Sequence, residues 1–155
     1  AIRANVGGTI TSVLTVNGAT GTITGYQINA NYADLAERFE ADAPYEPGTV
    51  LQIGGEKEVT TSSISHDPRV AGVVSTDPAY LMNSKTEGAA VALTGRVPCL
   101  VQGPVEKGDR LVNVAPGVAG KLDPAQYEPG CIIGKSLNAI EDSSVKLIEI
   151  AVGRD

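Results

Sequence analysis

The sequence predicts a mainly β protein: a short-stranded barrel or clip-like body, an extended N-terminal β arm and one short helix. Composition supports this, because the 155 residues include 18 Gly and 9 Pro but one Phe and no Trp. Gly and Pro favour short strands and tight turns, and few aromatics imply a core of small and β-branched side chains. We expect residues 1–30 to form the arm or stalk and residues 31–155 the head domain.

The arm is predicted from residues 8–30, GTITSVLTVNGATGTITGYQINA, in which apolar residues alternate imperfectly with Thr and Ser. The dipeptide Asn17-Gly18 favours a left-handed turn, so it predicts a hairpin between two short strands. A two-stranded unit is marginally stable in water. The arm is therefore expected to pair with the body or with identical arms of neighbouring chains.

A short helix is predicted over residues 32–41, where the apolar residues recur at helical spacing. Asn31 is placed to cap its start and Pro44 to stop it. The residues expected on its apolar face are Tyr32, Leu35, Ala36 and Phe39.

Strands are predicted for the rest of the chain, with Gly, Pro, Asn and Asp between them. They are expected at 49–53, 70–75, 89–93, 97–102, 110–114, 131–137 and 145–152. An internal repeat indicates a shared local structure, because the YEPG that begins YEPGTVLQIGG at Tyr45 occurs again in YEPGCIIGKSL at Tyr127. In both copies Pro-Gly is predicted to form a type II turn that leads into a strand. Repeated turn and strand units without helices indicate a barrel or clip rather than an alternating α/β enzyme.

The charge and residue types exclude several classes of function. A net charge of -6 without a basic stripe argues against nucleic-acid binding. The apolar runs are shorter than the roughly 20 residues that span a bilayer, so no membrane insertion is expected. One His and two unpaired Cys indicate no zinc site, and no cofactor is expected. Cys99 and Cys131 are expected to be buried thiols, and His66 a polar loop residue.

Common catalytic motifs are absent from the sequence, which contains no phosphate-binding loop, dinucleotide fingerprint, nucleophile elbow or HExxH motif. The remaining candidate for chemistry is the acidic cluster in NYADLAERFEA, residues 31–41. On a helix, Asp34 and Glu37 would share a face, where one protonated acid could polarise a carbonyl and the other act as base. The alternative is structural: on a helix, Asp34 would favour the N-terminus and would form an ion pair with Arg38.

NYADLAERFEA, followed by PGTVL and RVAGVVSTDPAYLMNS, resembles the C-terminal regions of tailed-phage fibre and neck-appendage proteins. Those regions include intramolecular-chaperone domains that cleave themselves from the mature fibre. The resemblance covers residues 31–84 and implies Asp34 and Glu37 as the acid pair and Ala33-Asp34 as the scissile bond. Here Ala33 replaces the small polar residue that usually precedes the cut, so an enzyme is not favoured.

These observations predict a structural protein on the surface of a phage virion, a trimeric fibre or appendage domain. Its partners would be two further copies, other capsid or tail proteins of the virion, and a host surface receptor. The first alternative is a capsid decoration protein, because YEPGTVLQIGG, GAAVALTGRVPCLV and VEKGDRLV also resemble small capsid-cementing proteins. The second is an enzyme, either the self-cleaving chaperone or, with less support from the few aromatics, a depolymerase.

Overall fold

The computed structural model describes residues 2–6, 9–25 and 33–153, and the chain divides into two compact units, Ala1–Asn31 and Tyr32–Asp155. The first unit is an antiparallel sheet of β1 (Ile2–Val6), β2 (Thr9–Asn17) and β3 (Thr22–Gly25), with β2 in the centre. The predicted hairpin is confirmed, since β2 and β3 pair, but the left-handed conformation expected at Asn17-Gly18 is wrong, because neither residue has a positive φ. Within that turn, Gly21 is the residue with positive φ (66°), and Asn17 Oδ1 accepts the Ala19 N–H.

The second unit contains ten strands and one short 3₁₀ turn, η1 (Pro124–Gln126). The first five strands are β4 (Asp34–Phe39), β5 (Val50–Ile53), β6 (Val59–Thr60), β7 (Val70–Val74) and β8 (Tyr80–Met82). The other five are β9 (Ala89–Gln102), β10 (Arg110–Ala115), β11 (Val118–Lys121), β12 (Ile132–Ser136) and β13 (Val145–Val152). The predicted mainly β fold is therefore confirmed, and no helix in the described ranges is long and apolar enough to cross a membrane.

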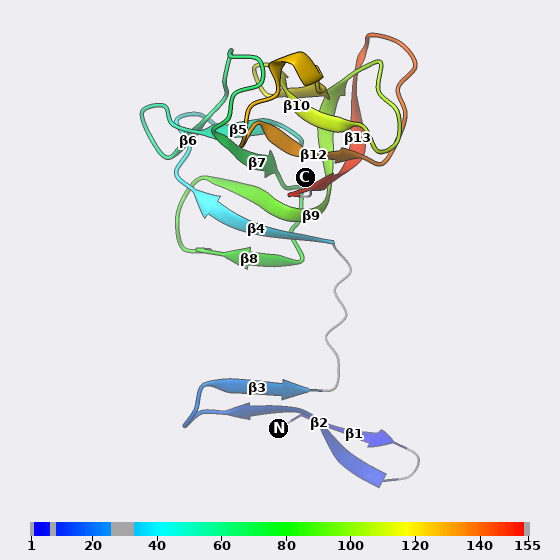
Figure 1. Ribbon diagram of the computed structural model, residues 1–155. Coiled ribbons are helices and arrows are strands. Elements are labelled where there is room, and N and C mark those ends of the chain that lie inside the picture. The colour runs from blue at the N-terminus through cyan, green and yellow to red at the C-terminus, as the bar shows by residue number, and fades with distance from the viewer. Residues whose placement is uncertain (1, 7–8, 26–32, 154–155) are drawn as a thin grey trace. The chain divides into compact units, whose positions relative to one another are not determined.

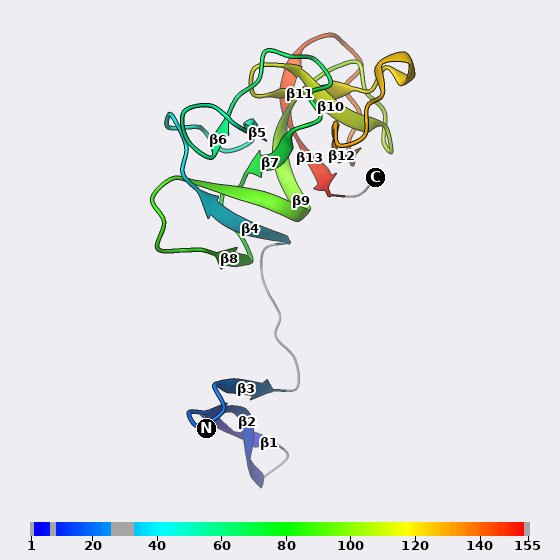
Figure 2. The same cartoon turned by 60° about the vertical axis from the view of Figure 1, so that its left-hand side comes forward.

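Five strands close a mixed barrel in the order β11, β10, β12, β13, β9 (Figures 1 and 2). Closure comes from a parallel contact between β9 and β11, in which Val101 aligns with Ala119. The other barrel pairs are antiparallel. Closing the sheet satisfies the hydrogen-bonding edges of its first and last strands.

The long strand β9 joins the barrel to the outer strands. Its first half lies between β4 and β7, and its second half lies between β13 and β11 (Figures 1 and 2). The two halves meet at Gly95, whose φ is 108°. A Cβ there would lie 2.2 Å from the Ala33 carbonyl oxygen, so only Gly allows β4 to begin this close to β9. Residues predicted as two strands, 89–93 and 97–102, therefore form one.

The core consists of small and β-branched side chains, as the composition predicts. A larger cluster fills the barrel and its contact with β5 and β7, and a smaller cluster lies under the outer strands. The larger one includes Val97, Val101, Leu111, Ile133 and Ile150, all at most 1% exposed.

The predicted helix over residues 32–41 is wrong, because residues 34–39 form strand β4. This segment pairs with β9 on one side and with β8 on the other, so its backbone groups are satisfied by neighbouring strands rather than within a helix. The apolar residues of this segment do recur at helical spacing, but pairing with β8 and β9 determines its conformation. The proposed cap, Asn31, and the apolar position Tyr32 lie outside the described residues.

Both repeated turns are confirmed. Gly48 and Gly130 have φ of 90° and 94°. The Thr49 N–H donates to the Glu46 oxygen at 3.2 Å, and the Cys131 N–H donates to the Glu128 oxygen at 3.1 Å. A positive φ at the third position is what a type II turn requires. The turns lead into β5 and β12 respectively.

Candidate functional site

Asp34 and Glu37 both lie on β4, but the strand separates their side chains. Successive residues of a strand point to opposite faces, so positions 34 and 37 lie on opposite sides of the sheet. Asp34 is 6% exposed, whereas Glu37 is half-buried. The shared face expected for the acid pair depended on a helix, and the strand does not bring the two carboxyl groups together.

Asp34 instead has a different polar partner. The Ser75 hydroxyl donates to Asp34 Oδ2 at 2.5 Å, and the Ala79 N–H donates to the Asp34 main-chain oxygen at 3.0 Å. On the other side, the Arg96 N–H donates to the Ala33 oxygen at 3.0 Å. The peptide bond between Ala33 and Asp34 is therefore held in the sheet on both sides. Ser75 lies at the end of β7 and was not identified from the sequence, because nothing local distinguishes it from other Ser residues.

His66 is not the simple polar loop residue that the sequence predicts, because it is buried. Its Nε2 accepts the Asp123 N–H at 3.1 Å, and its Nδ1 lies 2.8 Å from the Ser65 hydroxyl. Since Nε2 accepts, Nδ1 carries the proton and donates to Ser65. The ring therefore links the loop of residues 61–69 to the start of η1, which is a structural role.

Asp67, the one acid of that loop, is fully buried at 1% exposed. Arg69 donates to both of its carboxyl oxygens, at 2.9 and 2.7 Å, and Ser62 donates at 2.6 Å. The hydrogen bonds from Arg69 hold the pKa of Asp67 well below its ordinary value, although burial acts in the opposite direction. Asn113 on β10 donates to the main-chain oxygens of Ser62 and Ile64, which fixes the loop against the barrel.

Cys99 and Cys131 are both buried and not joined to each other, as predicted. Burial raises the pKa of the Cys99 thiol above its ordinary value, which disfavours the reactive thiolate. In the part of the chain that the structure describes, no three His, Cys, Asp or Glu side chains gather in a way that could hold a metal ion.

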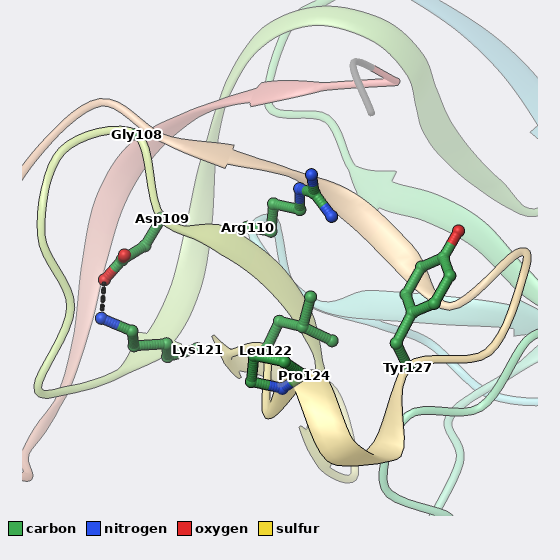
Figure 3. Close-up of a pocket in the computed structure, with 7 residues that line it drawn as sticks. All are labelled: Gly108, Asp109, Arg110, Lys121, Leu122, Pro124 and Tyr127. Atoms are coloured by element: carbon green, nitrogen blue, oxygen red, sulfur yellow. Dashed lines mark ion pairs between the residues drawn. The ribbon is translucent and has the colours of Figure 1, made fainter.

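An open hollow of about 530 Å³ lies between the start of β10, the end of β11 and η1 (Figure 3). Its lining combines charged, aromatic and apolar groups. The residues are Gly108, Asp109, Arg110, Lys121, Leu122, Pro124 and Tyr127. Of these, Tyr127 is 46% exposed and begins the second repeated turn. Hollows of similar volume, about 540 and 500 Å³, lie elsewhere on the head, so volume does not single this one out. Its combination of an exposed aromatic ring with charged groups makes it the candidate functional site.

At one end of the hollow, the charges of Lys121 and Asp109 neutralise each other in an ion pair. Lys121 Nζ lies 2.9 Å from Asp109 Oδ2, and the Glu106 N–H also donates to that oxygen, at 2.8 Å. Burial raises the pKa of Asp109, but these hydrogen bonds outweigh it and the pKa lies below its ordinary value. The hydrogen bond from Lys121 to Asp109 raises the pKa of the lysine. Both groups are thus charged at neutral pH and hold the ends of β10 and β11 together.

Figure 3 shows Arg110 between that ion pair and Tyr127, and its positive charge is not neutralised in this way. Arg110 is exposed, and it forms no ion pair with any acid among the described residues (Figure 3). No motif in the sequence predicts this site. The only signal was KGDR, residues 107–110, which is equally typical of an ordinary turn with a solvated charge.

In the comparisons with known proteins, the chain matches no family model and no curated protein at a significant level.

Proposed function

We propose that the chain is a structural protein on the surface of a tailed-phage virion, where three copies form a fibre or appendage domain. The observation that carries the proposal is the separate N-terminal unit, a three-stranded sheet within Ala1–Asn31. The resemblance over residues 31–84 supplies the class of protein, and the barrel supplies a rigid head. The barrel's buried polar contacts hold loops in place, which suits a structural role.

The arm gains stability by pairing with other copies. Three short strands are close to the minimum for an independent sheet, and a stable one needs a buried apolar face. The register aligns Val16 with Ile23, and Leu14 with Ile2 and Gly25, so apolar residue types recur at matched positions. Val16 is 61% exposed within one chain. Three arms around one axis would bury such positions, as closed rotational symmetry allows.

Light scattering at micromolar concentration tests the trimer, with an expected mass three times the 15.9 kDa of one chain. Val16→Asp should shift the mass toward one chain, because a carboxylate buried among apolar residues is costly. Thr15→Asp is the matched control, since Thr15 is exposed on the same strand but points to the opposite face. A folded wild-type monomer would overturn the proposal, and trimers in all three proteins would move the interface away from Val16.

The place on the particle is tested by immunogold electron microscopy with antibodies to the head. A fibre or appendage domain predicts labelling at the tail or neck. Uniform labelling of the capsid would instead support a decoration protein, and absence of label from intact virions would contradict both.

A further inference from the structure

The face of the barrel beside the hollow carries two cations directly opposite each other. Arg110 on β10 aligns with Lys135 on β12 in the antiparallel register. Directly opposed residues of an antiparallel pair project from the same face, with Cβ atoms about 4.5–5.5 Å apart. The adjacent pair in the register contains Leu111, which belongs to the barrel core, so Arg110 and Lys135 face outward.

Like charges in this position repel each other and destabilise the sheet unless an anion lies between them. Neither side chain forms an ion pair with an acid in the described part of the chain. The nearest acid in sequence, Asp109, already binds Lys121 and the Glu106 N–H. The chain as a whole has a net charge of -6, so an unneutralised cation pair is a local exception.

Beside the cations lies a surface suited to a sugar ring. Tyr127 lines the hollow with Leu122 and Pro124 (Figure 3). In the first copy of the repeated turn, the Tyr45 hydroxyl donates to Asp42 at 2.5 Å. In the second copy, Tyr127 forms no side-chain hydrogen bond with the described residues, and its ring is half exposed. An aromatic ring with an accessible face and hydroxyl can contact the apolar side of a sugar and also hydrogen-bond to it.

We propose that this hollow binds a pyranose that carries a carboxylate, a uronic-acid unit. Arg110, which lines the hollow, would bind the carboxylate through the planar fork of donors that matches its two oxygens. Lys135, which is half-buried and lies outside the lining but directly opposite Arg110 on the same face, would add a second positive charge beside it. Tyr127, Leu122 and Pro124 would contact the ring, and the roughly 530 Å³ of the hollow accommodates one or two sugar units. This inference goes beyond the virion proposal and does not depend on it.

Two-dimensional amide NMR titrations of the full chain with methyl glucuronide test the site. Methyl glucoside is the neutral control and acetate is the carboxylate without a ring. The glucuronide should shift amides at 108–110, 121–127 and 134–136, and should bind at least about tenfold more tightly than either control. Added salt should weaken binding, because the attraction is between exposed charges.

Three variants locate the binding. Arg110→Gln should weaken glucuronide binding by about tenfold or more, and Tyr127→Ala by about threefold or more. Lys85→Gln removes an exposed cation outside the hollow and should leave the affinity within about twofold. Equal binding of the glucoside or of acetate, or full affinity in Arg110→Gln, would overturn the proposal. A monomeric chain that binds the glucuronide would retain this site while refuting the trimeric virion domain.

Discussion

Buried polar residues decide how the loops of this protein are fixed to the barrel. Asp67 receives hydrogen bonds from Ser62 and Arg69, and His66 accepts the Asp123 N–H. Removing one partner of a buried hydrogen bond costs more than the bond itself contributes, because the remaining group is left without water. Asp34, bonded to Ser75, follows the same rule. Asp34 and Asp67 therefore stabilise the fold through their buried hydrogen bonds.

The ion pair of Asp67 makes stability depend on pH. Because Arg69 donates hydrogen bonds to the carboxylate, the pKa of Asp67 in the folded protein lies below the value of about 4 for an unfolded aspartate. Its stabilisation is complete above about pH 5 and is lost progressively as the pH falls below about 4. Asp67→Asn should therefore lower the free energy of unfolding by roughly 2 kcal/mol at pH 7.

Urea titrations at pH 7 and pH 3 measure this effect. The difference between wild type and Asp67→Asn should shrink at pH 3, where the wild-type carboxylate begins to lose its advantage. Asp77→Asn, at an exposed position, is the control and should change the unfolding free energy by less than about 0.5 kcal/mol. An equal loss for both variants would contradict the role of Asp67.

Asp34 and Glu37 should differ in their effect on stability. Asp34→Ala leaves the Ser75 hydroxyl without its partner and should cost about 1–3 kcal/mol. Glu37→Ala should cost less than about 1 kcal/mol, because Glu37 forms no side-chain hydrogen bond with the described residues. Intact mass spectrometry should show wild type and both variants uncut. Cleavage between Ala33 and Asp34 in wild type alone would establish the self-cleaving alternative.

At the scale of elements, turns with positive φ place the strands. Gly48, Gly108 and Gly130 have φ of 90°, 88° and 94°, but their surroundings differ. A Cβ at Gly108 would meet nothing within 4 Å, whereas one at Gly48 would lie 2.5 Å from Leu147 Cδ1. One at Gly130 would lie 2.5 Å from the Pro68 main-chain oxygen. Although the three glycines share one backbone conformation, the three positions should therefore differ in how well they tolerate a side chain.

Substitution by Ala should follow this order. Gly108→Ala should cost about 1–2 kcal/mol from backbone strain alone. Gly48→Ala should cost somewhat more, because the Leu147 side chain can turn away. Gly130→Ala should cost the most, because the Pro68 oxygen cannot move without shifting the loop that contains Asp67. Denaturant midpoints of the three variants measure the order, and equal losses would mean that strain alone decides.

At the scale of the whole molecule, each unit has its own basis of stability. Both apolar clusters of the head consist of residues from the second unit alone. The Val16→Asp variant that is expected to dissociate the trimer should therefore leave the free energy of unfolding of the head unchanged within about 0.5 kcal/mol. Denaturation followed by near-ultraviolet circular dichroism of the head tyrosines measures this. A head that unfolds when the trimer dissociates would place the interface on the barrel.

Features that depend on local chemistry could be predicted from the order of the amino acids. Gly and Pro composition indicated a mainly β chain, and the two YEPG segments indicated matching turns because Pro and Gly each restrict the backbone in a known way. Apolar runs located most strands of the head, including 145–152, which matches β13 in full. Burial of Cys99 and Cys131 followed from their apolar neighbours in the sequence.

Features that depend on contacts between distant segments could not be predicted in this way. Residues 34–39 have a spacing compatible with a helix, yet they form a strand because β8 and β9 pair with it from both sides. The barrel closes through β9 and β11, a parallel pairing that no local pattern encodes. The candidate site arises in the same way, since its lining comes from β10, β11 and the segment around η1, and Arg110 lies opposite Lys135 only through the register of β10 and β12. Strand pairing is a contact between segments far apart in sequence, and local propensity does not specify it.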